Sequence, residues 1–230
     1  MNFTSPIIEV EDSLEAVNDW FCREKLSDGL PIVPPTAERV ERMLGGTDRD
    51  SQEVIGSIPP KWAPASVEKI AINAVMAGCL PEYLPVVIAA VEAMCEPRFN
   101  LYGVQATTGY VGPALLVNGP IRKQLDINCD AGVFGPGYRS NATIGRAIRL
   151  ILITVGGGFP GDTDHSPLAG LVSTPCASAR TRKEVPGSRI MSRWDSSLKR
   201  ARSPCVVSMD FFLCTRREVG VSKLCHHWPR

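Results

Sequence analysis

The residue types best suited to chemistry lie within residues 134–161, FGPGYRSNATIGRAIRLILITVGGGFPG, where a glycine-broken loop runs into residues with helical spacing. Free backbone N–H groups and the helix dipole at such a start favour a bound anion. The segment lacks both the G-x-G-x-x-G and the GK[ST] pattern, so it is neither a dinucleotide fingerprint nor a P-loop. The alternative is a tight turn with Ser140 or Asn141 as an ordinary N-cap. The candidate ligand-binding residues here are Gly135, Gly137, Arg139, Ser140, Asn141, Thr143 and Arg146.

A second candidate is Cys79, which follows an apolar helical stretch and stands close to Glu82. A thiol in a helix-to-helix connection acts as a nucleophile when a positive neighbour lowers its pKa. We predict Cys79 and Glu82 as catalytic residues on this basis. The competing interpretation is a buried cysteine that serves as a small apolar side chain, and no histidine lies near it in the sequence.

Two further loops carry short polar side chains. Gln105, Thr107 and Thr108 lie in a glycine-bounded loop and are predicted to bind a polar ligand, unless they only satisfy their own backbone. The GDTDH run holds Asp162, Asp164 and His165, which could ligate a metal or supply acid and base groups, although a solvated loop explains the same residues. We predict no metal site, and the sequence identifies no cofactor.

Helices must position these residues. The apolar spacing predicts an amphipathic helix that begins at Ser66 and ends near Cys79. The next helix is expected to start at Leu84 or Pro85, because proline suits a first turn. Residues 46–64 read as surface loop, and residues 114–117 as one short buried strand. The predicted fold class is α+β or α/β, a helix-dominated single domain with a short sheet, followed by a poorly structured tail.

Charge divides the 230 residues in two. Residues 1–165 hold 13 Lys and Arg against 20 Asp and Glu, whereas residues 166–230 hold 12 against 4. We therefore assign a globular, enzyme-like domain to residues 1–165 and an anomalous basic tail, rich in Cys, Arg and Ser, to residues 166–230. No apolar run reaches the roughly 18 residues that span a bilayer, and no secretory signal is evident, so we expect a cytoplasmic protein with reduced cysteines.

The basic tail has three interpretations. A nucleic-acid or membrane-surface arm suits its charge, but residues such as Phe211 and Phe212 suit a solvated arm poorly. The second interpretation is a zinc module, but its ligands do not match the usual spacing: Cys205, Cys214, Cys225, His226 and His227. The third interpretation is translation out of frame. If the codons of residues 179–191 are read in a shifted frame, the genetic code permits the sequence ENEEGSPWEPYHV. The residues that follow permit EVGFKPEESAVTV in the same frame. Just after Ser166, that frame permits TLG, then one free position, then PGKY.

Four stretches also carry a resemblance: EKIAINAVMAGCLPEYLPVVIAAVEAM, FNLYGVQATTG, LLVNGPI and FGPGYRSNATIGRAIRLIL. Over residues 28–166 the chain resembles an uncharacterised, mainly bacterial family associated with proteins that bear a UGSC motif. The resemblance implies a continuation STLG.PGKY, then a cysteine, then ENEE.SPWEP.HVE.GF, which the shifted frame permits and this chain does not contain. The match between the shifted frame and this continuation implies that the tail is frameshifted, mis-spliced or derived from a pseudogene.

These observations predict an enzyme-family domain that binds a small polar or anionic molecule and is catalytically incomplete as written. Its pocket is expected between the loops at Gln105 and Arg139. The alternative is a non-catalytic subunit or interaction module of a hetero- or homo-oligomer, which a large exposed apolar patch would favour. Neither nucleic acid nor a membrane is expected as a partner.

Overall fold

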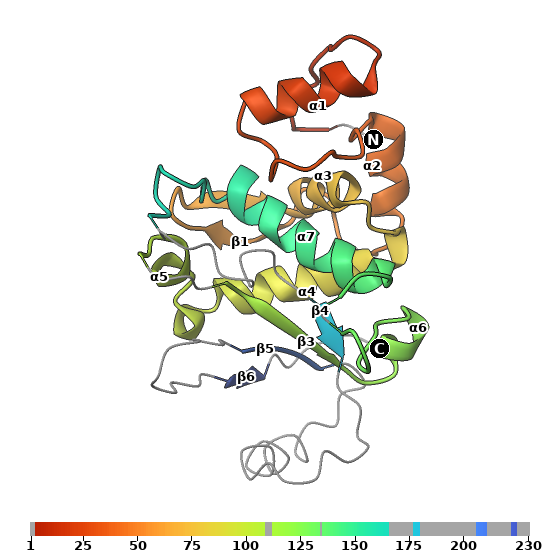
Figure 1. The fold of residues 1–230 in the computed structure, drawn as a ribbon, viewed down its shortest axis with the longest axis vertical. Coiled ribbons are helices and arrows are strands. Elements are labelled where there is room, and N and C mark those ends of the chain that lie inside the picture. Colours follow the sequence, from red (N-terminus) through yellow and green to blue (C-terminus); the bar gives the residue numbers. More distant parts are fainter. Residues whose placement is uncertain are drawn as a thin grey trace, which may run out of the picture.

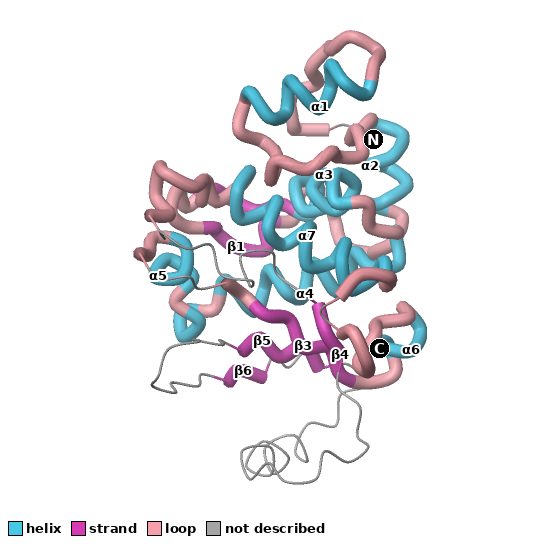
Figure 2. The backbone as a smooth tube through the Cα atoms, in the orientation of Figure 1, coloured by secondary structure: helices cyan, strands magenta, loops and turns pink. Residues whose placement is uncertain are grey.

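The computed structural model describes residues 3–108, 112–133 and 135–165, together with the backbone of three strands at 177–179, 206–210 and 222–224. Helices dominate the fold and surround α7, with two separate small sheets beside them (Figures 1 and 2). This confirms the predicted helix-dominated α+β class. The α-helices are α1 (Leu14–Arg23), α2 (Ala37–Leu44), α3 (Val67–Ala77), α4 (Leu84–Cys95), α5 (Leu101–Gln105), α6 (Ile121–Gln124) and α7 (Arg139–Thr154). Short 3-10 turns occupy Pro81–Tyr83 and Pro97–Phe99.

The core is the junction of α3, α4 and α7. On α7, an inward-facing stripe of buried side chains recurs every three or four residues, and four consecutive residues, Leu150–Ile153, are buried toward the carboxyl end. The stripe includes Ile144, Ile148 and Ile151, which are inaccessible to solvent. Because α4 is apolar around nearly its whole circumference, it is buried on almost every side, as its sequence predicts.

Local signals set the ends of α3. The Ser66 hydroxyl accepts a hydrogen bond from the Lys69 amide at 3.3 Å, and Gly78 ends the helix with a left-handed φ of 85°. The predicted helix from Ser66 to near Cys79 is therefore confirmed. The start of α4 at Leu84, with proline in its first turn, is confirmed as well.

The prediction that residues 46–64 are loop is wrong in its second half. Strands β1 (Val54–Ile58) and β2 (Ala63–Ser66) form an antiparallel hairpin there. The strands are short and carry proline, glycine and serine, so alternation of apolar residues is too weak to predict them. Ile58 at the end of β1 is nevertheless completely buried, which ties the hairpin to the core.

The predicted strand over residues 114–117 is confirmed as β3 (Ala114–Asn118). It pairs in parallel with β4 (Ala177–Ala179) and antiparallel with β5 (Val206–Asp210), and β5 pairs antiparallel with β6 (Ser222–Leu224). The rest of residues 166–230, including the proposed zinc ligands, lies outside the described residues. The predictions about the tail as a whole are not decided by these three strands.

The amino-terminal segment is fastened to α3 by Glu68, a carboxylate that solvent does not reach. Glu68 accepts hydrogen bonds from the backbone amides of Thr4 at 3.1 Å and Ser5 at 2.8 Å, and from the Gln52 side chain at 2.8 Å. Burial pushes the pKa of Glu68 upward, but these donors outweigh it and the pKa is lowered. The Glu68 carboxylate is therefore charged while it binds the amino-terminal segment. We call this contact the Glu68 clamp.

Helix α1 lies at one end of the molecule, beyond α3 (Figure 1), and none of its residues is fully buried. Its Asn18 accepts a hydrogen bond from the Ile32 amide at 2.7 Å, which joins it to the loop that follows. No helix among the described residues combines the length and the apolar character needed to cross a bilayer.

Candidate functional site

Helix α7 distributes the predicted site residues between its two ends. Arg139 begins the helix on the side of α6, and Leu152, which contacts Gln105, lies near its other end on the side of α5 (Figure 1). Thirteen residues of helix separate Arg139 from Leu152, a distance of about 20 Å at 1.5 Å per residue. The structure therefore does not bring Gln105 and Arg139 into one pocket. They belong to two separate polar clusters, one at each end of α7.

At the amino end of α7, Arg139 is exposed but held in place. Its Nε and Nη2 atoms donate to the Gly78 carbonyl oxygen at 3.1 and 2.9 Å. The helix has no side-chain cap hydrogen bond and no acidic residue within its own first turn. Gly135 and Gly137 precede it on the surface, and Gly137 has a φ of 115° that other residues rarely adopt. Arg139 and the helix start thus place positive groups here, while the acidic side chains of Glu82 and Asp126 lie close to the same turn.

Cys79 lies beside Arg139 and Thr143, so the predicted catalytic and anion-binding residues do meet here. Burial raises the pKa of the Cys79 thiol to about 12, although a hydrogen bond with Thr143 and the charge of Arg139 act in the opposite direction. The thiol is therefore neutral near pH 7, which argues against the predicted role as nucleophile. The Thr143 hydroxyl also donates to the Arg139 carbonyl oxygen at 2.8 Å.

The predicted partner Glu82 lies on the exposed surface of the Pro81–Tyr83 turn. Sequence reasoning missed its neighbour Tyr83, which is buried close to both Arg139 and Glu82. Burial raises the pKa of the Tyr83 hydroxyl, the charge of Glu82 adds to the rise, and Arg139 opposes it. Tyr83 therefore remains a neutral hydrogen-bonding group.

We expect Cys79 to resist alkylation in the folded protein. A thiol with a pKa of about 12 is almost entirely protonated at pH 7.5, and only the thiolate attacks iodoacetamide. Its modification rate should be at least about 100-fold lower than that of exposed Cys22 in the same sample. Peptide mass spectrometry after timed labelling measures both rates, and unfolding in urea should bring them together. Equal rates in the native protein would restore Cys79 as a candidate nucleophile.

Ser140 and Asn141 are not N-caps, because α7 begins one residue before Ser140 and both side chains point inward. The Ser140 hydroxyl donates to the Asp126 carbonyl oxygen at 2.8 Å. The Asn141 amide accepts from the Asn128 amide at 2.8 Å and donates to the Asn128 carbonyl oxygen at 3.0 Å. These two residues fix the loop after α6, so a direct role in ligand binding is not supported by their placement.

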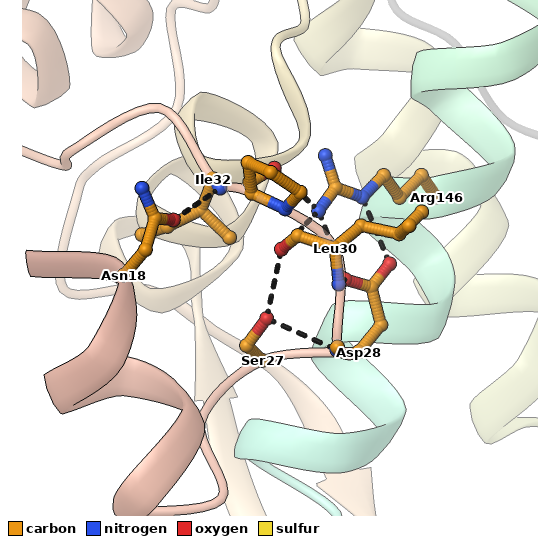
Figure 3. Close-up of polar contacts among 8 residues, drawn as sticks. Asn18, Ser27, Asp28, Leu30, Ile32 and Arg146 are labelled. Carbon is orange, nitrogen blue, oxygen red and sulfur yellow. Dashed lines mark hydrogen bonds and ion pairs between the residues drawn. The ribbon is translucent and has the colours of Figure 1, made fainter. Parts of the chain in front are cut away.

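Arg146 also makes contacts within the fold (Figure 3). Its Nε and Nη2 atoms donate to the two carboxylate oxygens of Asp28 at 2.8 and 2.9 Å, and Nη2 donates further to the carbonyl oxygens of Leu30 and Pro31. Both side chains of the ion pair are mostly buried. The predicted ligand-binding role of Arg146 is corrected to a structural one: it ties the loop after α1 to α7.

The second cluster lies at the carboxyl end of α7. Gln105 is buried, and its Nε2 atom donates to the carbonyl oxygens of Pro59 and Leu152, both at 3.1 Å. Gly158 packs closely against Gln105, because a Cβ atom added at position 158 would lie only 2.6 Å from the Gln105 Oε1 atom. Gln105 is therefore a packing residue that joins the hairpin turn to the end of α7.

Thr107 contacts the GDTDH run, because the His165 amide donates to the Thr107 carbonyl oxygen at 3.1 Å. Thr108 is exposed, and so is His165. Asp164 faces Arg149 of α7, a residue that sequence reasoning did not select although it follows Arg146 by one helical turn. Among the described residues, no three His, Cys, Asp or Glu side chains gather as metal ligands would.

Comparison of the chain with protein-family models, with curated proteins and with solved structures gives no match. Function must therefore be argued from the geometry of the two ends of α7. The amino end combines a fixed surface arginine, an uncapped helix start and a buried tyrosine. That combination suits binding of a negatively charged group better than covalent catalysis.

Proposed function

We propose that the chain binds a small anionic molecule at the amino end of α7, as an enzyme-family domain that lacks a complete catalytic apparatus. The observation that carries the proposal is the Arg139 guanidinium, held by the Gly78 carbonyl oxygen directly at an uncapped helix start. A fixed cation loses little conformational entropy when it binds, and the first turn of a helix favours the same anion through its backbone N–H groups and its dipole.

The first-turn amides and Arg139 suit a carboxylate or a phosphate, so the ligand is recognised by such a group. Gly135 and Gly137 let the loop approach that group closely, because neither carries a side chain. Incomplete catalysis is supported by the neutral Cys79 thiol and by the exposed position of Glu82 away from any histidine among the described residues. Membership of the UGSC-associated family and a cytosolic location stay predictions.

A titration of the full chain with inorganic phosphate and with acetate tests the proposal. Backbone amide resonances of residues 135–143 should shift in a saturable way in two-dimensional NMR spectra. Arg139→Gln should weaken the affinity about tenfold, since a hydrogen bond from a charged donor contributes roughly 1.5 kcal/mol or more. Arg98→Gln is the matched control, because Arg98 is exposed beyond the carboxyl end of α4. Equal affinities in the two variants, or shifts confined to other residues, would contradict the proposal.

One observation favours the alternative, an interaction module. Large apolar side chains are exposed around the amino-terminal segment and α1, namely Ile7, Ile8, Leu14 and Leu30, with Ile7 81% accessible. Exposed apolar patches mark protein interfaces more often than ligand sites. If neither anion binds and the chain sediments as an oligomer, this alternative replaces the first proposal.

A further inference from the structure

Helix α1 contributes little to the core of the molecule. Its Val17 and Phe21 side chains pack against the core while only partly buried, and no residue of the helix is fully buried. The helix lies at one end of the molecule, beyond α3 (Figure 1). In the described part of the chain, its outward side is therefore available for contact with another molecule.

Two exposed leucines lie close together at this end. Leu14, the first residue of α1, is 63% exposed, and Leu30 in the loop after the helix is 56% exposed. The Asn18 amide group connects the two segments, because it donates to the Leu14 carbonyl oxygen at 2.7 Å and accepts from the Ile32 amide at 2.7 Å (Figure 3). Leu14 and the residues around Leu30 therefore belong to one surface.

The same surface carries unpaired negative charge. Residues 1–22 contain no lysine or arginine. Five carboxylates among them are exposed and have no ion-pair or hydrogen-bond partner among the described residues: Glu9, Glu11, Asp12, Glu15 and Asp19. The dipole of α1 explains an acidic residue in its first turn, Glu15, but not Asp19 in the middle of the helix.

The acidic side chains lie beside the leucines. Glu15 directly follows Leu14, and Asp19 is its neighbour one helical turn later. The Ser13 amide donates to the Glu11 carbonyl oxygen at 2.8 Å, which places Glu11 beside the start of the helix. We call Leu14, Leu30 and the five carboxylates the α1 surface.

Nearby cations do not neutralise the α1 surface, because each already has an acidic partner. Arg23 lies 3.2 Å from Glu24, and Lys25 lies 3.5 Å from Asp162. Arg146 of α7 is held in the buried ion pair described above. The α1 surface is thus apolar and negatively charged at once.

This charge disfavours three other occupants. A second copy of the chain on a two-fold axis would bring the same carboxylates face to face, and like charges opposed across an interface are costly. An anionic lipid surface and a nucleic acid backbone are repelled for the same reason. A protein segment that carries lysine or arginine between apolar side chains complements both properties of the surface.

We propose that the α1 surface docks a basic amphipathic segment of a different protein. The apolar side chains of that segment cover Leu14 and Leu30, and its lysine or arginine side chains pair with the carboxylates. The inference does not rest on the anion site at the amino end of α7. It names the class of partner for the interaction module considered above.

A synthetic helix of leucine and lysine, with its leucines along one face, is the probe for the full chain. Isothermal titration calorimetry at low salt should give saturable binding, and replacement of the leucines of the probe by serine should weaken it at least about tenfold. A photo-reactive leucine analogue in the probe should cross-link within residues 7–33. Arg139→Gln should leave the affinity unchanged, which separates this docking from the proposed anion binding.

Charge reversal tests the electrostatic half of the proposal. The double variant Glu11→Lys with Asp19→Lys should weaken probe binding at least about tenfold, because attraction becomes repulsion. Neither position is in the first turn of α1, so the helix keeps its favourable first-turn charge. The matched control is Glu38→Lys with Asp130→Lys, which changes the net charge equally at exposed positions elsewhere and should weaken binding less than about twofold.

A single substitution tests the apolar half. Leu14→Ser should weaken probe binding about fivefold, because the probe then covers less apolar area. Val54→Ser on β1 is the matched control, since Val54 is 56% exposed, and should leave the affinity unchanged. Leu14→Ser keeps a short side chain at an exposed position, so it decides the matter even if the charge variant fails to fold.

Four results would overturn the proposal. One is the absence of saturable binding, as expected if residues 166–230 of the chain itself cover the α1 surface. Another is cross-linking outside residues 7–33. The third is equal affinity of the wild type and the charge-reversal variant for the probe. The fourth is a dimer of the free chain that Leu14→Ser dissociates, which would make a second copy the occupant.

Discussion

Replacement of Arg146 by methionine should lower the free energy of unfolding by about 4 kcal/mol, the usual loss when one partner of a buried ion pair is removed. The change leaves the Asp28 carboxylate, which is 11% exposed, without its bidentate partner. It also removes the donors to the Leu30 and Pro31 carbonyl oxygens. Urea unfolding followed by circular dichroism measures the loss.

The control for this variant is Arg23→Met, which removes a surface pair with Glu24 and should change the unfolding free energy by less than about 0.5 kcal/mol. The double variant Asp28→Leu with Arg146→Met should recover part of the loss, since no unpaired charge remains buried. A loss below about 1 kcal/mol for Arg146→Met alone would show that the pair contributes little.

Acidification of the wild-type protein should also lower the free energy of unfolding, because it breaks the same Asp28–Arg146 ion pair. Burial pushes the pKa of Asp28 upward, but the hydrogen bond and charge of Arg146 outweigh it, so the pKa lies below its ordinary value. A lowered carboxyl pKa means that the stabilisation is complete above about pH 4, the unfolded-state pKa, and is lost as the pH falls through the folded-state pKa. Arg146→Met should lack this component of acid destabilisation.

Gln105→Met should cost about 3 kcal/mol of unfolding free energy, because a lost hydrogen bond and an unsatisfied buried acceptor add together. The shape of the side chain is nearly kept, but the Pro59 carbonyl oxygen loses the Gln105 donor. The Leu152 carbonyl oxygen loses Gln105 as well and keeps the Gly158 amide. Thermal and urea unfolding of the variant give the value.

Gln124→Met on the exposed face of α6 is the matched control and should be neutral within about 0.5 kcal/mol. A neutral Gln105→Met variant that fails to bind a polar ligand would instead return Gln105 to the predicted binding role. The two outcomes are separable because stability and binding are measured on the same sample.

The helices could be predicted from the sequence because their signals are local. The apolar spacing from Ser66 onward and the proline at the start of α4 act within one or two turns, and the apolar spacing of α7 identifies its buried face. The hairpin could not be predicted, because its short strands depend on packing of Ile58 against the core rather than on alternation.

The polar residues were harder, because their roles depend on partners far along the chain. Ser140 and Asn141 have the chemistry of caps, yet their hydrogen bonds go to the loop after α6. Arg146 finds Asp28 across 118 residues, a separation over which no sequence pattern acts. Gly135, Gly137 and Arg139 could be predicted as surface residues at a helix start, since that depends only on neighbours.

The Glu68 clamp makes Thr4 and Ser5 an integral part of the helical body. A shortened version that began after Ser5 would strip a fully enclosed carboxylate of two backbone donors, leaving only the Gln52 amide to compensate its charge. Trimming this end for expression would therefore loosen the first turn of α3.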